Sequence, residues 1–260
     1  MVYNCPTLHL DRIDAVVFDT DDVVVDTARL HSAAWKRTFD DFLHRHGEHT
    51  GVLLPPFEPP ADYLRAADGQ SGIEGVRRFL SNRGISIPEF STDPAAETVQ
   101  SLAATKDAWF LEEVRRLRIT PYPSTVELLR ELRARGTRTA AVSESRNSSQ
   151  VLAAAGVADL FDVQVDGVDA AVLGLPSRPD PALLLEATRR LGVSPRRSAA
   201  LTSSLAGVEA AWSGCFEPIM GVDRHGEKSN LYRLGAHVVV ADLAELTVSG
   251  ERQPQVLTHR

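Results

Sequence analysis

The sequence predicts a protein of the α/β class, with a parallel-sheet core and a helical domain inserted after the first strand. From residue 121 onward, short apolar runs alternate with helical patterns, which is typical of strands buried on both faces of a parallel sheet. Residues 27–118, in contrast, contain helical patterns and no convincing strand. At about 150 residues per domain, 260 residues leave room for one core and one smaller unit.

Five apolar runs are the expected strands. The first of them ends at Asp19, the second is followed by Ser143, and the fourth is followed by Asp223. Each is too short for a buried helix and long enough for a buried strand. The five runs are residues 13–18, 137–142, 198–201, 218–222 and 237–241.

Helices are expected between these strands. Ser124 and Glu127 have the spacing of a capping box, and Gly136 would end the helix that they begin. A second helix covers 181–191, with a proline in its first turn. A third presents Leu205, Val208 and Trp212 on one face.

The inserted region is expected to hold three further helices, at residues 27–46, 72–83 and 95–117. Residues 53–60 contain four prolines and are therefore expected to form a loop. The predicted division is a core formed by residues 1–27 and 119–260 and a helical domain formed by residues 28–118.

Composition excludes several classes of protein. The hydrophobic share of 43% and the charged share of 24% are those of a globular chain. A net charge of −7 disfavours general binding to nucleic acid or to an anionic membrane. No apolar segment approaches the ~18 residues that span a bilayer, and the N-terminus lacks a signal-peptide pattern. With only Cys5 and Cys215, far apart, the expected location is the reducing cytoplasm.

Chemistry-bearing side chains follow two of the predicted strands. Asp19 and Asp21 come directly after the first strand, at the sheet edge where α/β proteins bind ligands. Two such carboxylates can act as nucleophile and as acid/base, although a solvated acidic loop has the same pattern. Ser143 follows the second strand, where a hydroxyl beside helix amides can bind phosphate or simply cap the helix.

These motifs resemble those of the haloacid dehalogenase (HAD) superfamily, and most closely its β-phosphoglucomutase-like branch. Residues 18–28, FDTDDVVVDTA, are similar to the first motif of that branch, and residues 142–147, VSESRN, to the second. LAGVEA at 205–210 and GAHVVVADL at 235–243 also match, in the right order. The resemblance extends from about residue 13 to residue 246.

The resemblance implies a Rossmann-like parallel-sheet core and a helical cap that closes over the site. It implies that Asp19 is the nucleophile that carries the phosphoryl group and that Asp21 is the general acid/base. It also implies a Mg²⁺ ion on Asp19, on the backbone carbonyl of Asp21 and on acidic residues of the fourth motif. The expected ligand is a small molecule, a sugar or sugar phosphate; the candidates that would bind it are Ser143, Glu144, Asn147, Arg178 and His31.

The third and fourth motifs depart from the family pattern. Arg178 stands where the family has a lysine, and its guanidinium is bulkier although it still binds phosphate. Thr202 and Ser203 stand where the family has an acidic pair, so metal binding is expected to be weak. Asp22 replaces a glycine and adds a negative charge, with the option that it serves as a substitute ligand.

The sequence of the predicted cap also departs from the family pattern. Gln70 and Gly72 occupy the positions of a basic pair that would hold a second phosphate. Lys106 and Asp107 are interpreted as a surface pair in preference to a substrate contact, while His31 either approaches Asp21 or packs in the interior.

Three hypotheses follow for function. The first is an active phosphatase or phosphomutase, and the second is a catalytically degenerate relative that binds a ligand or partner through the same cleft. The third is an enzyme with changed, metal-independent chemistry at Asp19 or Asp21. The departures in the third and fourth motifs favour Mg²⁺-dependent phosphoryl transfer through Asp19 that is weakened or lost. The oligomeric state is left open.

Overall fold

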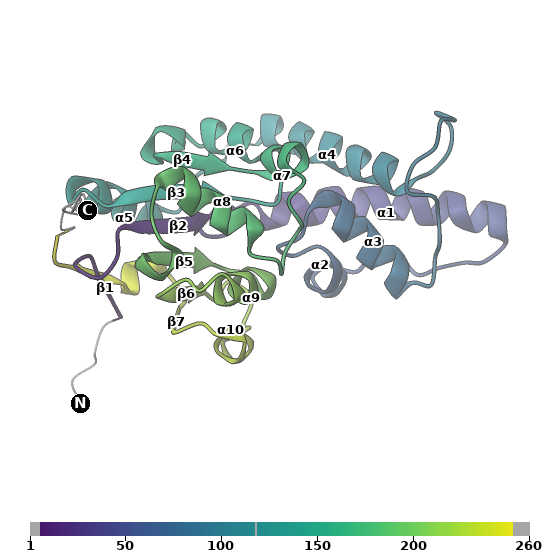
Figure 1. Ribbon diagram of the computed structural model, residues 1–260. Coiled ribbons are helices and arrows are strands. Elements are labelled where there is room, and N and C mark those ends of the chain that lie inside the picture. Colours follow the sequence, from purple (N-terminus) through teal and green to yellow (C-terminus); the bar gives the residue numbers. More distant parts are fainter. Residues whose placement is uncertain (1–5, 118, 252–260) are drawn as a thin grey trace.

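A six-stranded parallel sheet forms the centre of the computed structural model, which describes residues 6–117 and 119–251 (Figure 1). The strand order is β4-β3-β2-β5-β6-β7. The strands are β2 (Ala15–Asp19), β3 (Arg138–Val142), β4 (Val163–Val165), β5 (Ser198–Thr202), β6 (Ile219–Val222) and β7 (Val238–Val240). This confirms the α/β class.

Both faces of the sheet are buried, which is why its strands are almost continuously apolar. Along β2, Val16 and Phe18 join one hydrophobic cluster, and Ala15 and Val17 join the other. The period-two alternation of a strand therefore divides β2 between two cores. The first core is covered by α5 (Pro123–Ala134) and α6 (Ser148–Ala154), and the second by α8 (Ala182–Leu191), α9 (Leu205–Ser213) and α10 (Lys228–Leu234).

The five predicted strands are confirmed, but three strands were missed. The missed strands are β4 at the sheet edge and the parallel pair β1 (Thr7–His9) and β8 (Thr247–Ser249). Each has three residues, as β7 does, but polar residues interrupt the apolar run that reveals β7. Four helices of six or seven residues were missed because they are too short to show a helical period: α2 (Ala61–Ala66), α6, α7 (Gly167–Leu173) and α10.

Two details of the helices predicted for the core are wrong. The expected capping box at Ser124 does not form: α5 has Tyr122 at its N-cap and Pro123 in its first turn, and no side chain caps it. Proline starts the helix one residue earlier because its φ angle is already helical. Trp212 lies on α9 as expected, but its side chain is 59% exposed instead of packing in the core.

The inserted region is helical and has its own core. It contains α1 (Ala28–Thr50), α2, α3 (Gly72–Asn82) and α4 (Val99–Arg116), which gather at one end of the sheet in Figure 1. Stacked aromatic rings hold these helices together, with the ring centroids of Phe39 and Phe79 3.7 Å apart. Helix α4 begins at Val99, and not at 95, because Thr98 and Ser101 form a capping box. The residue boundaries of the two domains remain a prediction.

Among the described residues, no helix combines the length and the apolar character that crossing a membrane requires.

Candidate active site between the sheet and the helical cap

Three neighbouring strands bring the predicted site residues to one edge of the sheet. Asp19 is the last residue of β2, Thr202 is the last residue of β5, and Ser143 directly follows β3. Strand β2 pairs with β3 on one side and with β5 on the other. Because the strands are parallel, their carboxyl ends open onto the same crevice.

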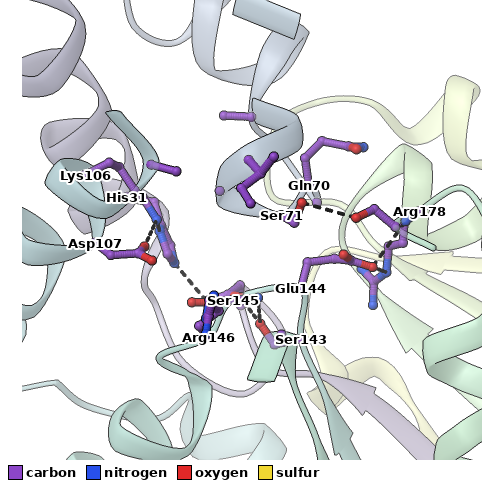
Figure 2. Close-up of a pocket in the computed structure, with 18 of the residues that line it drawn as sticks. His31, Gln70, Ser71, Lys106, Asp107, Ser143, Glu144, Ser145, Arg146 and Arg178 are labelled. Carbon is purple, nitrogen blue, oxygen red and sulfur yellow. Dashed lines mark hydrogen bonds and ion pairs between the residues drawn. The ribbon is translucent and has the colours of Figure 1, made fainter. Parts of the chain in front are cut away.

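The helical cap covers this edge and encloses a cavity of about 830 Å³ (Figure 2). The Ser177 hydroxyl of the core lies 3.1 Å from the hydroxyl of Ser71, the N-cap of α3. Gly69 packs so closely on the core that a Cβ atom there would lie 2.4 Å from Oγ of Ser204. The cap and the core are therefore in contact, and the cavity lies between them.

Asp19 is held by side chains of the protein itself. The Arg178 guanidinium donates to both of its carboxylate oxygens, with Nη1 2.9 Å from Oδ2 and Nη2 on Oδ1. The Thr202 hydroxyl also donates to Oδ2. A carboxylate has about four lone-pair positions, so three of them are occupied. The Asp19 side chain is only 7% exposed.

A second carboxylate lies on the other side of Arg178. Oε1 of Glu144 accepts the backbone N–H of Arg178 at 3.2 Å and lies 3.9 Å from its Nε. Burial raises the pKa of Glu144 even though the Arg178 charge opposes that shift. Burial would lower the pKa of Arg178, but the charge and hydrogen bonds of Asp19 raise it above its usual value. Arg178 thus stays cationic between two buried carboxyls.

Asp21 has a different environment. Its carboxylate accepts hydrogen bonds from Thr27 Oγ1 at 2.6 Å and from Ser143 Oγ at 2.9 Å, and its Oδ1 lies 3.3 Å from Nε2 of His31. Burial alone would raise the pKa of Asp21, but the interactions with His31, Thr27 and Ser143 lower it far below its ordinary value. With 33% of its side chain exposed, the ionised Asp21 carboxylate can be reached from the cavity.

A buried lysine from the cap completes this network. Nζ of Lys106 lies 3.0 Å from Nδ1 of His31 and 3.4 Å from the Asp107 carboxylate (Figure 2). Because a lysine can only donate, Nδ1 accepts and the proton of a neutral His31 sits on Nε2, facing Asp21. Burial and then the Lys106 charge lower the pKa of His31, which keeps the ring neutral.

The interpretation of Lys106 as a surface pair is therefore wrong. Its side chain is 4% exposed, and burial lowers its pKa. The signal was present in the sequence: Lys106 falls in helical register with Val99, Leu102, Ala103 and Phe110, which are buried. A lysine on the apolar face of a helix has to find a partner in the interior. His31, left open between packing and approach to Asp21, does both, since it also stacks on Phe110.

The other predicted candidates are placed differently. Asn147 is buried but does not line the cavity. Asp22 has a φ angle of 59°, in the left-handed region that suits the glycine of the family pattern. Its Oδ1 accepts a hydrogen bond from the first N–H of α1 at 3.0 Å. Its Oδ2 lies 3.4 Å from His225. The Asp22 carboxylate is therefore occupied at the start of α1.

Asp68 of the cap was not among the predicted site residues, although it lines the cavity. Burial raises its pKa to about 7, with smaller contributions from Asp22 and Asp19 that raise it and from His225 and Arg178 that lower it. An unfolded aspartate has a pKa near 3.9, so the folded chain retains a proton that the unfolded chain has already lost. This proton stabilises the fold at low pH, and the stabilisation is lost as the pH rises through 7.

We therefore expect Asp68→Asn to remove the part of the unfolding free energy that changes with the protonation of Asp68. The wild type should lose about 2 kcal/mol of unfolding free energy between pH 5 and pH 8 that the variant retains. Urea unfolding at the two pH values measures it. Asp41→Asn, at an exposed position, serves as the control. Parallel pH profiles for wild type and Asp68→Asn would contradict the assignment.

The parallel sheet, the helical cap and the aspartates at the carboxyl end of β2 define a cap-bearing α/β protein of the hydrolase class. A sequence model of haloacid dehalogenase-like hydrolases matches residues 13–212, and the chain belongs to that family. It is similar to a β-phosphoglucomutase of Mycobacterium bovis, with 39% identity over 241 residues that cover 91% of this chain and 92% of the relative.

Solved structures share the fold. A β-phosphoglucomutase from Clostridium difficile superposes with a TM-score of 0.71 at 23% identity, covering 89% of this chain and 92% of its own. A mutant of CbbY from Rhodobacter sphaeroides was solved in complex with xylulose-(1,5)bisphosphate. It superposes with a TM-score of 0.66 at 25% identity, covering 91% of this chain and 97% of its own. Together with the relative at 39% identity, this shared fold shows that the chain lies in the β-phosphoglucomutase-like branch.

The Mg²⁺ ion that this family implies does not fit the residues present. Thr202 and Ser203 offer hydroxyls where carboxylates are expected, and Ser203 Oγ donates to the backbone carbonyl of Asp21 at 3.3 Å. Among residues 6–117 and 119–251, no three His, Cys, Asp or Glu side chains gather in a way that could hold a metal.

Proposed function

We propose that this protein binds a sugar or sugar phosphate in the cavity between cap and core, and that phosphoryl transfer through Asp19 is strongly weakened or lost. The observation that carries the proposal is the hold of Arg178 and Thr202 on Asp19. A nucleophilic carboxylate needs a lone pair facing the substrate, and hydrogen bonds from Arg178 and Thr202 occupy three of the four lone-pair positions of Asp19.

The cavity supports the binding half of the proposal. A volume of about 830 Å³ suits a small organic ligand, and the lining combines an apolar surface with convergent polar groups. Gln70, Ser71 and Asp107 supply donors and acceptors for hydroxyl groups from the cap side. A relative of the same fold was solved with a bisphosphorylated sugar, which places sugar phosphates among the ligands to test.

The cap favours a ligand with at most one phosphate. Gln70 and Gly72 line the cavity where the family pattern has basic residues. Arg77 also lines it, but its Nε and Nη2 are bound to Glu89 at 2.8 and 3.0 Å. Arg146, exposed at the rim beside Ser145, is the cation best placed to meet an anionic group.

A second candidate function rests on Asp21. The hydrogen bonds from Thr27 and Ser143 and the neutral His31 keep Asp21 anionic and partly exposed to the cavity. Such a carboxylate can accept a hydrogen bond from a bound hydroxyl group and then receive its proton, although its lowered pKa makes it a weak base. Metal-independent proton transfer is therefore the alternative to pure ligand binding.

A phosphatase assay tests the catalytic half. Losing the Lewis-acid contribution of a metal costs several kcal/mol, which at 1.36 kcal/mol per decade is about a thousandfold. With Mg²⁺ and a panel of hexose and pentose phosphates, we expect turnover below about 10⁻² s⁻¹. Turnover above about 1 s⁻¹ that disappears in Asp19→Asn would overturn the proposal.

A binding assay with a matched pair of glycine variants tests the other half. Gly69 and Gly84 both have a φ angle of +66°, but only at Gly69 would a Cβ atom strike the core. We expect Gly69→Ala to hold the cap away from Ser204 and to weaken binding of glucose or glucose 6-phosphate at least ~10-fold, about 1.4 kcal/mol. Gly84→Ala should bind as the wild type does.

Calorimetry and thermal shift measure both variants. Equal weakening by the two substitutions would place the ligand outside the cleft. Failure of the whole panel of sugars and sugar phosphates to bind would overturn the binding half of the proposal.

A further inference from the structure

We propose that the guanidinium of Arg178 is a built-in cation that replaces a metal ion. Together with the hydroxyl donors of Thr202 and Ser203, it takes the positions around Asp19 and Asp21 that a metal ion would take. The inference rests on the proposed function and extends it. It states what replaces the metal, and it predicts that the cleft is complete without a divalent ion.

The first observation is that the positive charge in the cleft comes from a side chain. The two terminal nitrogens of Arg178 face the two oxygens of Asp19 side by side, the fork geometry in which a guanidinium binds a carboxylate most firmly. Arg178 is 4% exposed, so water does not compete for its donors. A lysine in this position would supply a point charge and no such fork.

The second observation concerns the two hydroxyls that replace acidic side chains. Thr202 donates to the Asp19 carboxylate, and Ser203 donates to the backbone carbonyl of Asp21. Both acceptors are oxygens that the family pattern assigns to a metal ion. Each oxygen therefore receives a proton donor from the protein in place of a bond to a metal.

The third observation is the packing around the donors. A Cβ atom on Gly207 would lie 2.0 Å from Oγ1 of Thr202 and 3.1 Å from Oδ2 of Asp19. Glu144 closes the opposite side, with its Oε1 bound to the backbone N–H of Arg178. The guanidinium is therefore fixed in place between two carboxyl groups, and the hydroxyl of Thr202 is held against Asp19 by α9.

Metal binding to the full chain, without any sugar ligand, tests the proposal. We expect Mn²⁺ up to 1 mM to stay free in solution with the wild type, as followed by its EPR signal, and 10 mM Mg²⁺ to change the melting temperature by less than about 1 °C. Arg178→Ala removes the built-in cation and exposes the oxygens of Asp19. That variant should bind Mn²⁺ at least ~10-fold more tightly and be stabilised by Mg²⁺ by about 3 °C.

Arg197→Ala is the matched control. Arg197 also makes a two-pronged contact with a buried aspartate, Asp14, through Nε and Nη2 at 2.7 and 3.1 Å, and neither residue lines the cavity. Mg²⁺ should not stabilise this variant. If Mg²⁺ raised the melting temperature of both variants alike, the effect would be a general one of salt on buried carboxylates, and the proposal would be overturned.

Two further outcomes are decisive. Submillimolar Mn²⁺ binding by the wild type would overturn the built-in cation, even if no phosphate is released and the proposed function stands. An Arg178→Ala protein that folds but ignores Mg²⁺ and Mn²⁺ would overturn it too. If Arg178→Ala does not fold, Arg178→Gln is measured in the same way, because glutamine keeps part of the packing and removes the charge.

Discussion

Replacing Arg178 with alanine is expected to lower the free energy of unfolding by about 3–5 kcal/mol, because it leaves two buried carboxyls without their shared cation. The side chains of Asp19 and Glu144 are 7% and 5% exposed, so water replaces the guanidinium poorly. For a chain of this size the melting temperature should fall by roughly 10 °C. Urea unfolding at pH 7.5 measures the loss.

Arg178→Lys and a double variant separate charge from geometry. Lysine keeps the charge but not the two parallel hydrogen bonds to Asp19, so about half of the loss should remain. Combining Arg178→Ala with Asp19→Asn removes both members of the pair, and this double variant should be more stable than Arg178→Ala alone. A loss below about 1 kcal/mol for Arg178→Ala would mean that the ion pair is not a buried one.

Asp21→Asn is expected to cost about 3 kcal/mol, because hydroxyl donors then face an amide group that itself donates. Thr27 and Ser143 both donate to the carboxylate, and an asparagine can turn its oxygen to only one of them. The exposed Asp26, five residues further along the chain, is the matched control, and its Asn variant should change stability by less than about 0.5 kcal/mol.

Asp21→Asn should also change how the free energy of unfolding falls at acidic pH. Because the folded pKa of Asp21 lies below its unfolded value, its contribution is present above about pH 4 and is lost as the pH falls further. The wild type should therefore lose stability between pH 4 and pH 2 more steeply than Asp21→Asn does. Urea midpoints across that range measure it, and identical slopes would contradict a carboxylate stabilised by His31, Thr27 and Ser143.

The main sheet could be predicted because burial on both faces leaves a local mark. Residues 15–18 and 140–142 are continuously apolar and send alternate side chains to the two cores, and the five predicted strands are confirmed. Strand β4 has three residues with Gln164 at its centre, and β1 pairs with β8 across 240 positions of the chain. Neither signal can be seen in a window of a dozen residues.

The sequence by itself determined the α/β class, the helical insertion, and the gathering of Asp19, Asp21 and Ser143 at one sheet edge. These follow from local periodicity and from the rule that parallel strands end together. The partner of Arg178 was decided only by the tertiary structure. The sequence suggested a substrate phosphate, whereas the fold places the guanidinium on Asp19, 159 residues away. Which charges meet depends on how loops from different strands pack, and that packing is set by the whole core.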